Sequence, residues 1–418
     1  MIPGPRSRAL AEALGRVECP GISYLSERWP IFWERAQGAH VFDVDGHQYV
    51  DLTAAFGVMS VGHANPRVVS AVTEQAQTLM HGMGDVHPPA IKVALLEALA
   101  ELTPPGLDRA ILGLNGSDAV ESALKCAELV TGKSGVIAFE GGYHGLAGSA
   151  LSVTARRAFR DPFAGRLAGQ TTFLEFPTDA PAADRVLSEF RRKLTSPGSG
   201  MTPTGALILE PIQGRGGVRV PPSGFIAALA AVCREFDVLL IADEIFTGLG
   251  RTGTWFAMDH EGVVPDLLCI GKALGGGMPL SACVGGENTL GLWPASEGEA
   301  LHTSTFLGHP VSCAAALASL RELQERCLEE RAERLGSRVM TRLRDAGQVV
   351  RGRGLLIGIE LDSGEAAMRV TQAALEAGVL LLPSGDTGQV LSLSPPLVIE
   401  EGTLDGAIDV VLECLSLA

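Results

Sequence analysis

Residues 265–277 read PDLLCIGKALGGG, and this stretch decides the fold. Residues 267–270 form a short, wholly apolar run, which is typical of a strand covered by helices on both faces. Similar runs precede it and alternate with helical patterns, which indicates βα units around a mainly parallel sheet. The expected strands of that sheet are residues 110–112, 136–139, 206–209, 238–242 and 267–270.

The pattern changes after Pro310, where long and strongly charged helical segments begin. Apolar residues recur there at a spacing of four and predict one buried stripe: Leu335, Val339 and Leu343. Short strands are expected at 355–361 and 390–393. We therefore expect a large α/β domain over residues 50–308 and a smaller α+β domain over 309–418, with residues 1–49 packing against the smaller one.

Composition narrows the possible partners. The 418 residues are 46% hydrophobic and carry a net charge of -15, so the surface repels phosphate backbones and anionic membranes. The eight cysteines form no CxxC pair, and no apolar run approaches the ~20 residues of a membrane span. We expect a soluble cytoplasmic protein without a nucleic-acid, membrane or metal partner.

Lys272 follows the expected strand 267–270 after one glycine and precedes three further glycines. A lysine at the carboxyl end of a parallel strand faces the crevice in which α/β proteins bind ligands. Partial desolvation in such a crevice lowers the pKa of an amine and makes it a nucleophile toward carbonyl groups. The alternative is an ordinary lysine at a strand end.

Asp243 ends the apolar run VLLIAD and should emerge at the same edge of the sheet. A carboxylate there could keep a heteroaromatic nitrogen protonated, which pyridoxal phosphate requires to act as an electron sink. The alternative is an aspartate that caps a helix or lies in a loop.

Two glycine-containing turns complete the pattern. Gly116 and Ser117 begin a helical segment, where free N–H groups and the helix dipole suit a phosphate. Alternatively, Ser117 is simply the cap of that helix. In the turn GGYHG, Tyr143 could stack on a flat ring, with His144 beside it. The alternative is a loop tyrosine that packs on its own domain.

In this order the elements resemble the class III aminotransferases, the pyridoxal phosphate enzymes of ornithine, acetylornithine, 4-aminobutyrate and ω-amine transamination. The similarity runs from about residue 41 to 310 and more weakly to 397. It is carried by segments such as DVDGHQYVDL, NGSDAVESALKCA, GGYHG, EPIQG, ADEIFTGLGRTGTWFA and TSTFLGHP. The resemblance implies fold type I, with a large mainly parallel-sheet domain and a smaller α+β C-terminal domain.

The resemblance also implies roles for single residues. Lys272 matches the Schiff-base lysine that moves the proton, and Asp243 matches the partner of the pyridine nitrogen. Thr305 matches a threonine that reaches the phosphate from the neighbouring subunit, which implies a homodimer with shared active sites. Further cofactor contacts are expected from Gly116, Ser117, Tyr143, His144 and Glu210.

Several positions depart from the family pattern, and most concern substrate recognition. Leu146 and Ser392 stand where dicarboxylate-using members carry arginines, and Arg215 stands where an acid is usual. Losing both arginines favours an amine without an α-carboxylate, since a buried carboxylate needs a partner. Arg215 could supply the missing charge, or it is a surface arginine in the loop QGRGG. Phe246 and His309 also depart from the usual residues.

Four aromatic residues could line the outer part of the substrate pocket, or could serve core packing or subunit contact instead. They are Tyr24, Trp29, Trp33 and Phe56.

These observations predict an aminotransferase that moves an amino group from an amine or ω-amino compound to an oxo acid, pyruvate being favoured, by a ping-pong mechanism. A glutamate-1-semialdehyde-type aminomutase is an alternative, although the intact GRTGTWFA segment disfavours it. An amino-acid racemase or epimerase and a dialkylglycine-type decarboxylase remain open, because they differ only in the bond broken or in the fate of the proton. A non-enzymatic cofactor-binding regulator would require loss of Lys272 or Asp243, and both are present.

Overall fold

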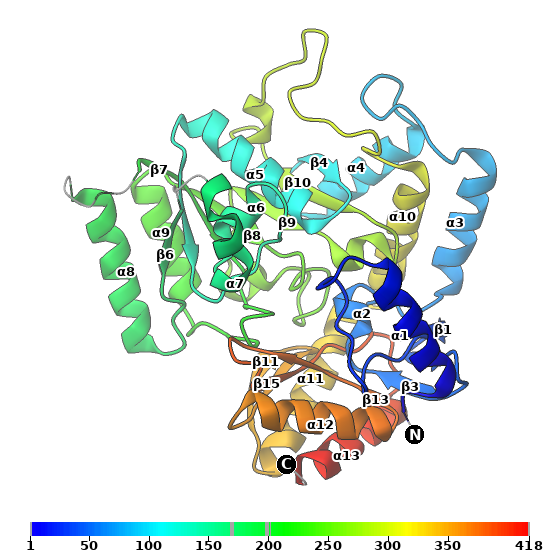
Figure 1. Ribbon diagram of the computed structural model, residues 1–418. Helices are drawn as coiled ribbons and strands as arrows, with labels where there is room; N and C mark the ends of the chain where they lie inside the picture. The colour runs from blue at the N-terminus through cyan, green and yellow to red at the C-terminus, as the bar shows by residue number, and fades with distance from the viewer. Residues whose placement is uncertain (1, 168–170, 197–199, 201, 417–418) are drawn as a thin grey trace.

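A seven-stranded sheet forms the centre of the molecule in the computed structural model, which describes residues 2–167, 171–196, 200 and 202–416 (Figure 1). Its strands run in the order β4 (Arg109–Gly113), β10 (Ser281–Gly285), β9 (Leu267–Ile270), β8 (Leu239–Asp243), β7 (Thr204–Leu209), β5 (Gly135–Phe139) and β6 (Thr171–Leu174). The five strands predicted for this sheet are present, and the prediction of a mainly parallel sheet is confirmed. β10 pairs antiparallel with both β4 and β9.

Each central strand is buried on both faces. In β7, Leu207 and Leu209 belong to one hydrophobic cluster, whereas Ala206 and Ile208 belong to another. Helix α5 (Gly116–Thr131) contributes to the second cluster, while α8 (Ala180–Thr195) and α9 (Phe225–Glu235) contribute to the first. This two-sided burial explains why the strands are continuous apolar runs in the sequence.

Helix α5 begins at Gly116, two residues earlier than a cap at Ser117 would allow. Asn115 is the N-cap: its side chain accepts a hydrogen bond from Asp118 N, and the Asp118 carboxylate accepts bonds from Asn115 N and, at 2.8 Å, from Leu114 N. The interpretation of Ser117 as the cap was therefore wrong, because this reciprocal capping box outcompetes a single hydroxyl. Ser117 lies in the first turn, and the helix ends at Thr131 with Gly132 as its C-cap.

A smaller antiparallel sheet is formed by the C-terminal part of the chain. It comprises β11 (Val349–Arg353), β12 (Leu356–Glu360), β15 (Val390–Leu393) and β14 (Leu382–Ser384). Helices α11 (Leu328–Asp345), α12 (Gly364–Glu376) and α13 (Glu401–Ser416) accompany it. The predicted stripe of α11 is buried, which confirms it: Leu335, Val339 and Leu343. Helix α10 (Pro310–Glu325) instead packs on α3 (Pro66–Thr78) and α4 (Ala90–Leu102). The boundary at residue 309 stays a prediction.

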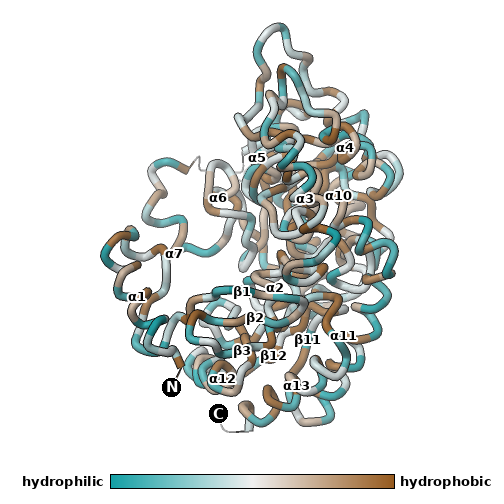
Figure 2. The backbone as a smooth tube through the Cα atoms, turned by 90° about the vertical axis from the view of Figure 1, so that its right-hand side faces the viewer, coloured by the Kyte–Doolittle hydropathy of each residue, from teal (hydrophilic) through white to brown (hydrophobic). Residues whose placement is uncertain are grey.

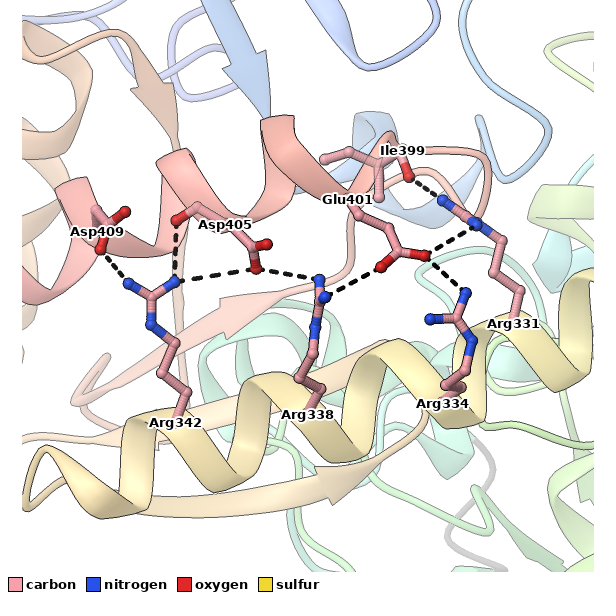
Figure 3. Close-up of polar contacts among 8 residues, drawn as sticks. All are labelled: Arg331, Arg334, Arg338, Arg342, Ile399, Glu401, Asp405 and Asp409. Carbon is pink, nitrogen blue, oxygen red and sulfur yellow. Dashed lines mark hydrogen bonds and ion pairs between the residues drawn. The ribbon is translucent and has the colours of Figure 1, made fainter.

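The other side of α11 carries arginines that tie it to α13 (Figure 3). Arg338 binds Glu401 and Asp405 at 3.0 Å each. Flanking arginines extend the ladder in both directions: Arg331 and Arg334 contact Glu401, and Arg342 contacts Asp405 and Asp409. These charged residues of α11 and α13 thus form ion pairs that join the two helices.

The N-terminal strands lie with the C-terminal elements at one end of the molecule (Figures 1 and 2). After helix α1 (Pro5–Val17) come β1 (Trp33–Gln37), β2 (His40–Asp43) and β3 (Gln48–Asp51), which pair antiparallel in sequence order. β13 (Val379–Leu380) then extends this sheet, parallel to β3. Residues before position 52 and residues near position 380 therefore share one sheet. Within the described residues, no helix is both long and apolar enough to cross a membrane.

Candidate active site

A cavity of about 960 Å³ lies at the carboxyl edge of the large sheet and is bordered by residues of the N-terminal segment and the C-terminal domain. Most of the predicted site residues line it: Phe56, Gly116, Ser117, Tyr143, His144, Glu210, Arg215, Asp243 and Lys272. The structure thus brings together residues that are more than 200 positions apart in the sequence.

Lys272 follows β9 and begins the short helix η3 (Lys272–Gly275) with φ at 41°. A non-glycine residue in the left-handed region costs roughly 1–2 kcal/mol, and such strain concentrates at functional sites. Burial lowers the pKa of the Lys272 amine, Asp243 and Glu210 oppose this effect, and Arg215 adds to it. Its Nζ atom lies 4.4 Å from the ring centroid of Phe246. The amine is therefore easier to deprotonate than an exposed lysine, as a nucleophile requires.

Asp243 ends β8, where it pairs with Cys269 of β9 three residues before Lys272. Its Oδ1 atom accepts a hydrogen bond from Ile245 N, and its Oδ2 atom lies 2.7 Å from Nδ1 of His144. Asp243 and His144 are both buried. The carboxylate is therefore held in one orientation, which suits a group that must bind a ring nitrogen.

Glu210 connects the two loops on either side of the site. Its Oε1 atom accepts a hydrogen bond from Tyr143 N at 2.9 Å, and its Oε2 atom accepts one from Gly214 N at 3.0 Å. Burial raises the pKa of the Glu210 carboxyl. The ring of Tyr143 packs edge-on against Phe159, with centroids 6.1 Å apart. Tyr143 therefore borders the cavity while packing on its own domain, so the two interpretations of its sequence context coexist.

The turn at the start of α5 is approached closely by its neighbours. A Cβ atom at Gly116 would lie 2.9 Å from Cδ1 of Ile245, so only glycine fits there without a shift. Gly145 has φ at 121°, and a Cβ atom there would lie 2.1 Å from the hydroxyl of Ser117. The first-turn amide groups of α5 face a cavity edge, and the Asp118 carboxylate is occupied by the amides that precede the helix. An anion can therefore be held there by helix N–H groups.

Two predicted site residues do not line the cavity. Leu146 is 47% exposed, in the segment between Gly145 and α6 (Ala150–Val153). Its assignment to substrate binding stays a prediction. Thr305 lies in an exposed segment outside the cavity, so its contact with a cofactor across a subunit boundary stays a prediction.

The outer aromatic residues divide. Tyr24, Trp29 and Phe56 line the cavity, whereas Trp33 does not and instead contacts His63 edge-on at a centroid distance of 5.8 Å. Phe56 is 65% exposed and lies in a turn in which three consecutive non-glycine residues have positive φ values. The N-terminal segment therefore supplies Tyr24 and Trp29 to the cavity wall, and Phe56 follows it in the sequence.

Sequence reasoning missed Arg156, which lines the cavity between α6 and α7 (Arg157–Arg160). Its Nη2 atom donates a hydrogen bond to Gly385 O at 2.8 Å, and its guanidinium carbon lies 5.7 Å from the centroid of Phe159. The sequence ARRAFR contains three arginines, and nothing in the spacing singles out the first. Arg156 is singled out only by its contact with Gly385, which lies 229 positions later in the sequence.

Arg251, another cation of the large domain, has a structural role. It is almost completely buried and donates hydrogen bonds to Leu355 O, Pro395 O and Ser60 Oγ. Burial lowers the pKa of its guanidinium to about 9. Arg251 does not line the cavity, so it is not a carboxylate clamp.

A strand-end lysine, an oriented carboxylate on the next strand and a helix N-terminus define the site of a pyridoxal phosphate-dependent transferase. The family model for class III aminotransferases matches residues 23–415. The chain is 38% identical over 388 residues to an acetylornithine aminotransferase of Methanosarcina acetivorans, covering 92% of this chain and 91% of that protein. It is 35% identical to a 4-aminobutyrate aminotransferase of Mycobacterium leprae, covering 99% and 96%. The ornithine aminotransferase structure from Toxoplasma gondii superposes with a TM-score of 0.88 at 31% identity, covering 98% and 95%.

The chain therefore belongs to the class III aminotransferase family and is a pyridoxal phosphate-dependent enzyme. The cavity fits this cofactor, because it offers an amine for the aldehyde, a carboxylate for the ring nitrogen and helix amides for the phosphate. The fold prediction, a large mainly parallel domain with a smaller α+β domain, is confirmed.

Proposed function

We propose that the protein transfers an amino group from an amine or ω-amino compound to an oxo acid by a ping-pong mechanism. The observation that carries the proposal is the placement of Lys272 and Asp243 at the ends of adjacent strands in one cavity. Relatives named for acetylornithine and 4-aminobutyrate support a donor whose amino group lies at the end of a chain. A homodimeric assembly in the cytoplasm belongs to the same proposal.

The chain's own groups have separate tasks in this proposal. When bound, pyridoxal phosphate supplies the carbonyl for capture of the amine and an electron sink for the carbon next to it. Lys272 acts as the nucleophile and then removes and returns the proton at the reacting carbon. Asp243, held by His144, keeps the ring nitrogen protonated. Glu210 fixes the loops that carry Tyr143 and Arg215.

The acceptor follows from the charges on the cavity wall. The sequence favours pyruvate, because Arg215 alone stands in for two family arginines and one cation suits one carboxylate. Ser392 lines the cavity, and its hydroxyl lies 2.7 Å from that of Ser384 instead of contributing a charge. Arg156, however, is a second cation on the wall. The preference for pyruvate stays a prediction. The lack of a second cation does not support it, because Arg156 and Arg215 both line the cavity.

The test uses the cofactor-loaded enzyme with 4-aminobutyrate, N-acetylornithine or a simple alkylamine as donor, and pyruvate or 2-oxoglutarate as acceptor. If the enzyme transfers the amino group, one molecule of alanine (from pyruvate) or glutamate (from 2-oxoglutarate) should form for each donor molecule consumed. Lys272→Ala should form neither product. A mutase or racemase would instead convert a single amino compound without any oxo acid, and that result would overturn the proposal.

A further inference from the structure

Two arginines from different segments of the large domain meet around one aromatic ring in the cavity. The guanidinium carbons of Arg156 and Arg215 each lie 5.7 Å from the ring centroid of Phe159. Arg215 also lies over Tyr143, at 4.9 Å. The rings hold both cations by cation–π contact, and the cavity wall is positively charged at this place.

Neither guanidinium group has an acidic partner among the described residues. Asp386 lines the same cavity but forms an ion pair with Arg219 at 2.9 Å. Glu210 is bound by two backbone amides, and Asp243 is bound by His144. Two like charges held close together without a counter-ion favour the binding of an anion from solution, because guanidinium groups bind carboxylates by charge-assisted hydrogen bonds.

The two arginines have different neighbours in the cavity. Arg215 follows Gly214, against which the ring of Phe246 packs, and the centroid of that ring lies 4.4 Å from Nζ of Lys272. Arg156 instead contacts Gly385, in the loop of the C-terminal domain whose Asp386 pairs with Arg219. Arg215 is thus the cation on the Lys272 side of the cavity, and Arg156 is the cation on the side of the C-terminal domain.

We propose that Arg156 is a specificity-determining residue: it binds the carboxylate that lies far from the reacting carbon of a dicarboxylic oxo acid, while Arg215 binds the near carboxylate. This inference rests on the proposed transfer to an oxo acid. It assigns the recognition of two carboxylates to arginines other than those missing at positions 146 and 392. A monocarboxylic oxo acid such as pyruvate would contact Arg215 alone.

The experiment measures kcat/KM for 2-oxoglutarate and for pyruvate with the pyridoxamine form of the enzyme. Arg156→Gln should lower the value for 2-oxoglutarate about tenfold or more, since a charge-assisted hydrogen bond is lost, and should change the value for pyruvate by less than about twofold. Arg215→Gln should lower both values. The matched control is Arg157→Gln, because Arg157 is an exposed neighbour that pairs with Asp161 and should change neither.

A second measurement does not depend on turnover. Calorimetry on the cofactor-loaded enzyme should give tighter binding for glutarate than for butyrate, and Arg156→Gln should remove this difference. If Arg156→Gln lowers kcat/KM equally for both acceptors, Arg156 only positions the loop at Gly385. If it lowers neither value, Arg156 does not bind a carboxylate. Either result would overturn the assignment. If the parent enzyme aminates no oxo acid, the proposed function fails, while the glutarate comparison still decides the anion site.

Discussion

The Nδ1 atom of His144 lies 2.7 Å from Oδ2 of Asp243, and both side chains are buried at the carboxyl edge of the large sheet. His144 N donates to Thr154 Oγ1, which in turn donates to Gly145 O. The imidazole is thus fixed by its own loop and holds the carboxylate from the side. Among the described residues, Nε2 of His144 has no hydrogen-bond partner. Of the two ring nitrogens of His144, only Nδ1 has a hydrogen-bond partner among the described residues, and that partner is Asp243.

This pair predicts graded effects on catalysis. Asp243→Asn should retain the fold and slow proton abstraction by orders of magnitude, because the ring nitrogen loses its ionic partner. His144→Phe should slow the same step by about tenfold, because a buried hydrogen bond to a charged group contributes about 1.5–3 kcal/mol. Single-turnover absorbance changes with an amine donor measure the step, and His144→Gln should recover part of the rate. Parent-like rates in Asp243→Asn would rule out its role.

Lys272 should carry the cofactor. The parent enzyme should be yellow and form an adduct that borohydride reduces onto Lys272, whereas Lys272→Ala should show neither property. Because burial lowers the pKa of this amine, the rate at which apoprotein captures the cofactor should rise with pH and level off below the ordinary lysine pKa. Asp243→Asn should move that plateau to lower pH, since Asp243 raises the lysine pKa. A plateau that moves to higher pH would contradict this electrostatic coupling.

Thr305 tests the shared-site assembly. Thr305→Ala should weaken cofactor binding, measured by equilibrium dialysis, because a phosphate contact from the neighbouring subunit is lost. Ser304→Ala is the matched control, as both hydroxyls lie in the same exposed segment. Gel filtration of the parent should give at least a dimer. A fully active monomer at the assay concentration would refute the idea.

Arg251 should be important for stability and not for substrate choice. Arg251→Met leaves the carbonyls of Leu355 and Pro395 buried without their donor and should lower the free energy of unfolding by about 2–5 kcal/mol. Arg338→Met, which removes an exposed arginine from the ladder on α11, should shift the urea midpoint much less. The ratio of the kcat/KM values for 2-oxoglutarate and pyruvate should stay constant in both variants, and a changed ratio in Arg251→Met would reopen its role as a clamp.

The sequence alone determined five of the seven strands of the large sheet and the two functional residues at strand ends. Runs such as 238–242 and 267–270 are continuously apolar because both faces of their strands are covered, and this property is local in the sequence. The residue that follows such a run must emerge at the carboxyl edge. Lys272 and Asp243 could therefore be placed in one crevice without coordinates.

Strand β10 and the cap of α5 were harder to predict. The segment SACVG is short and consists mainly of small residues, and its antiparallel insertion between β4 and β9 has no hairpin signal. At the start of α5, the reciprocal bonds between Asn115 and Asp118 make Asn115 the cap instead of Ser117. Both features depend on how well one group binds its partner compared with the alternatives: a strand with its neighbouring strands, and a side chain with the helix amides. The sequence of one segment does not show this.

Only the tertiary structure decided the contacts between residues distant along the chain. His144 and Asp243 are 99 positions apart, and Arg156 and Gly385 are 229 apart. Leu146, although adjacent to the GGYHG turn, is exposed and is not among the residues that line the cavity. Local patterns specify which faces are buried, but the direction of one side chain in a loop is set by the surfaces that fold against it.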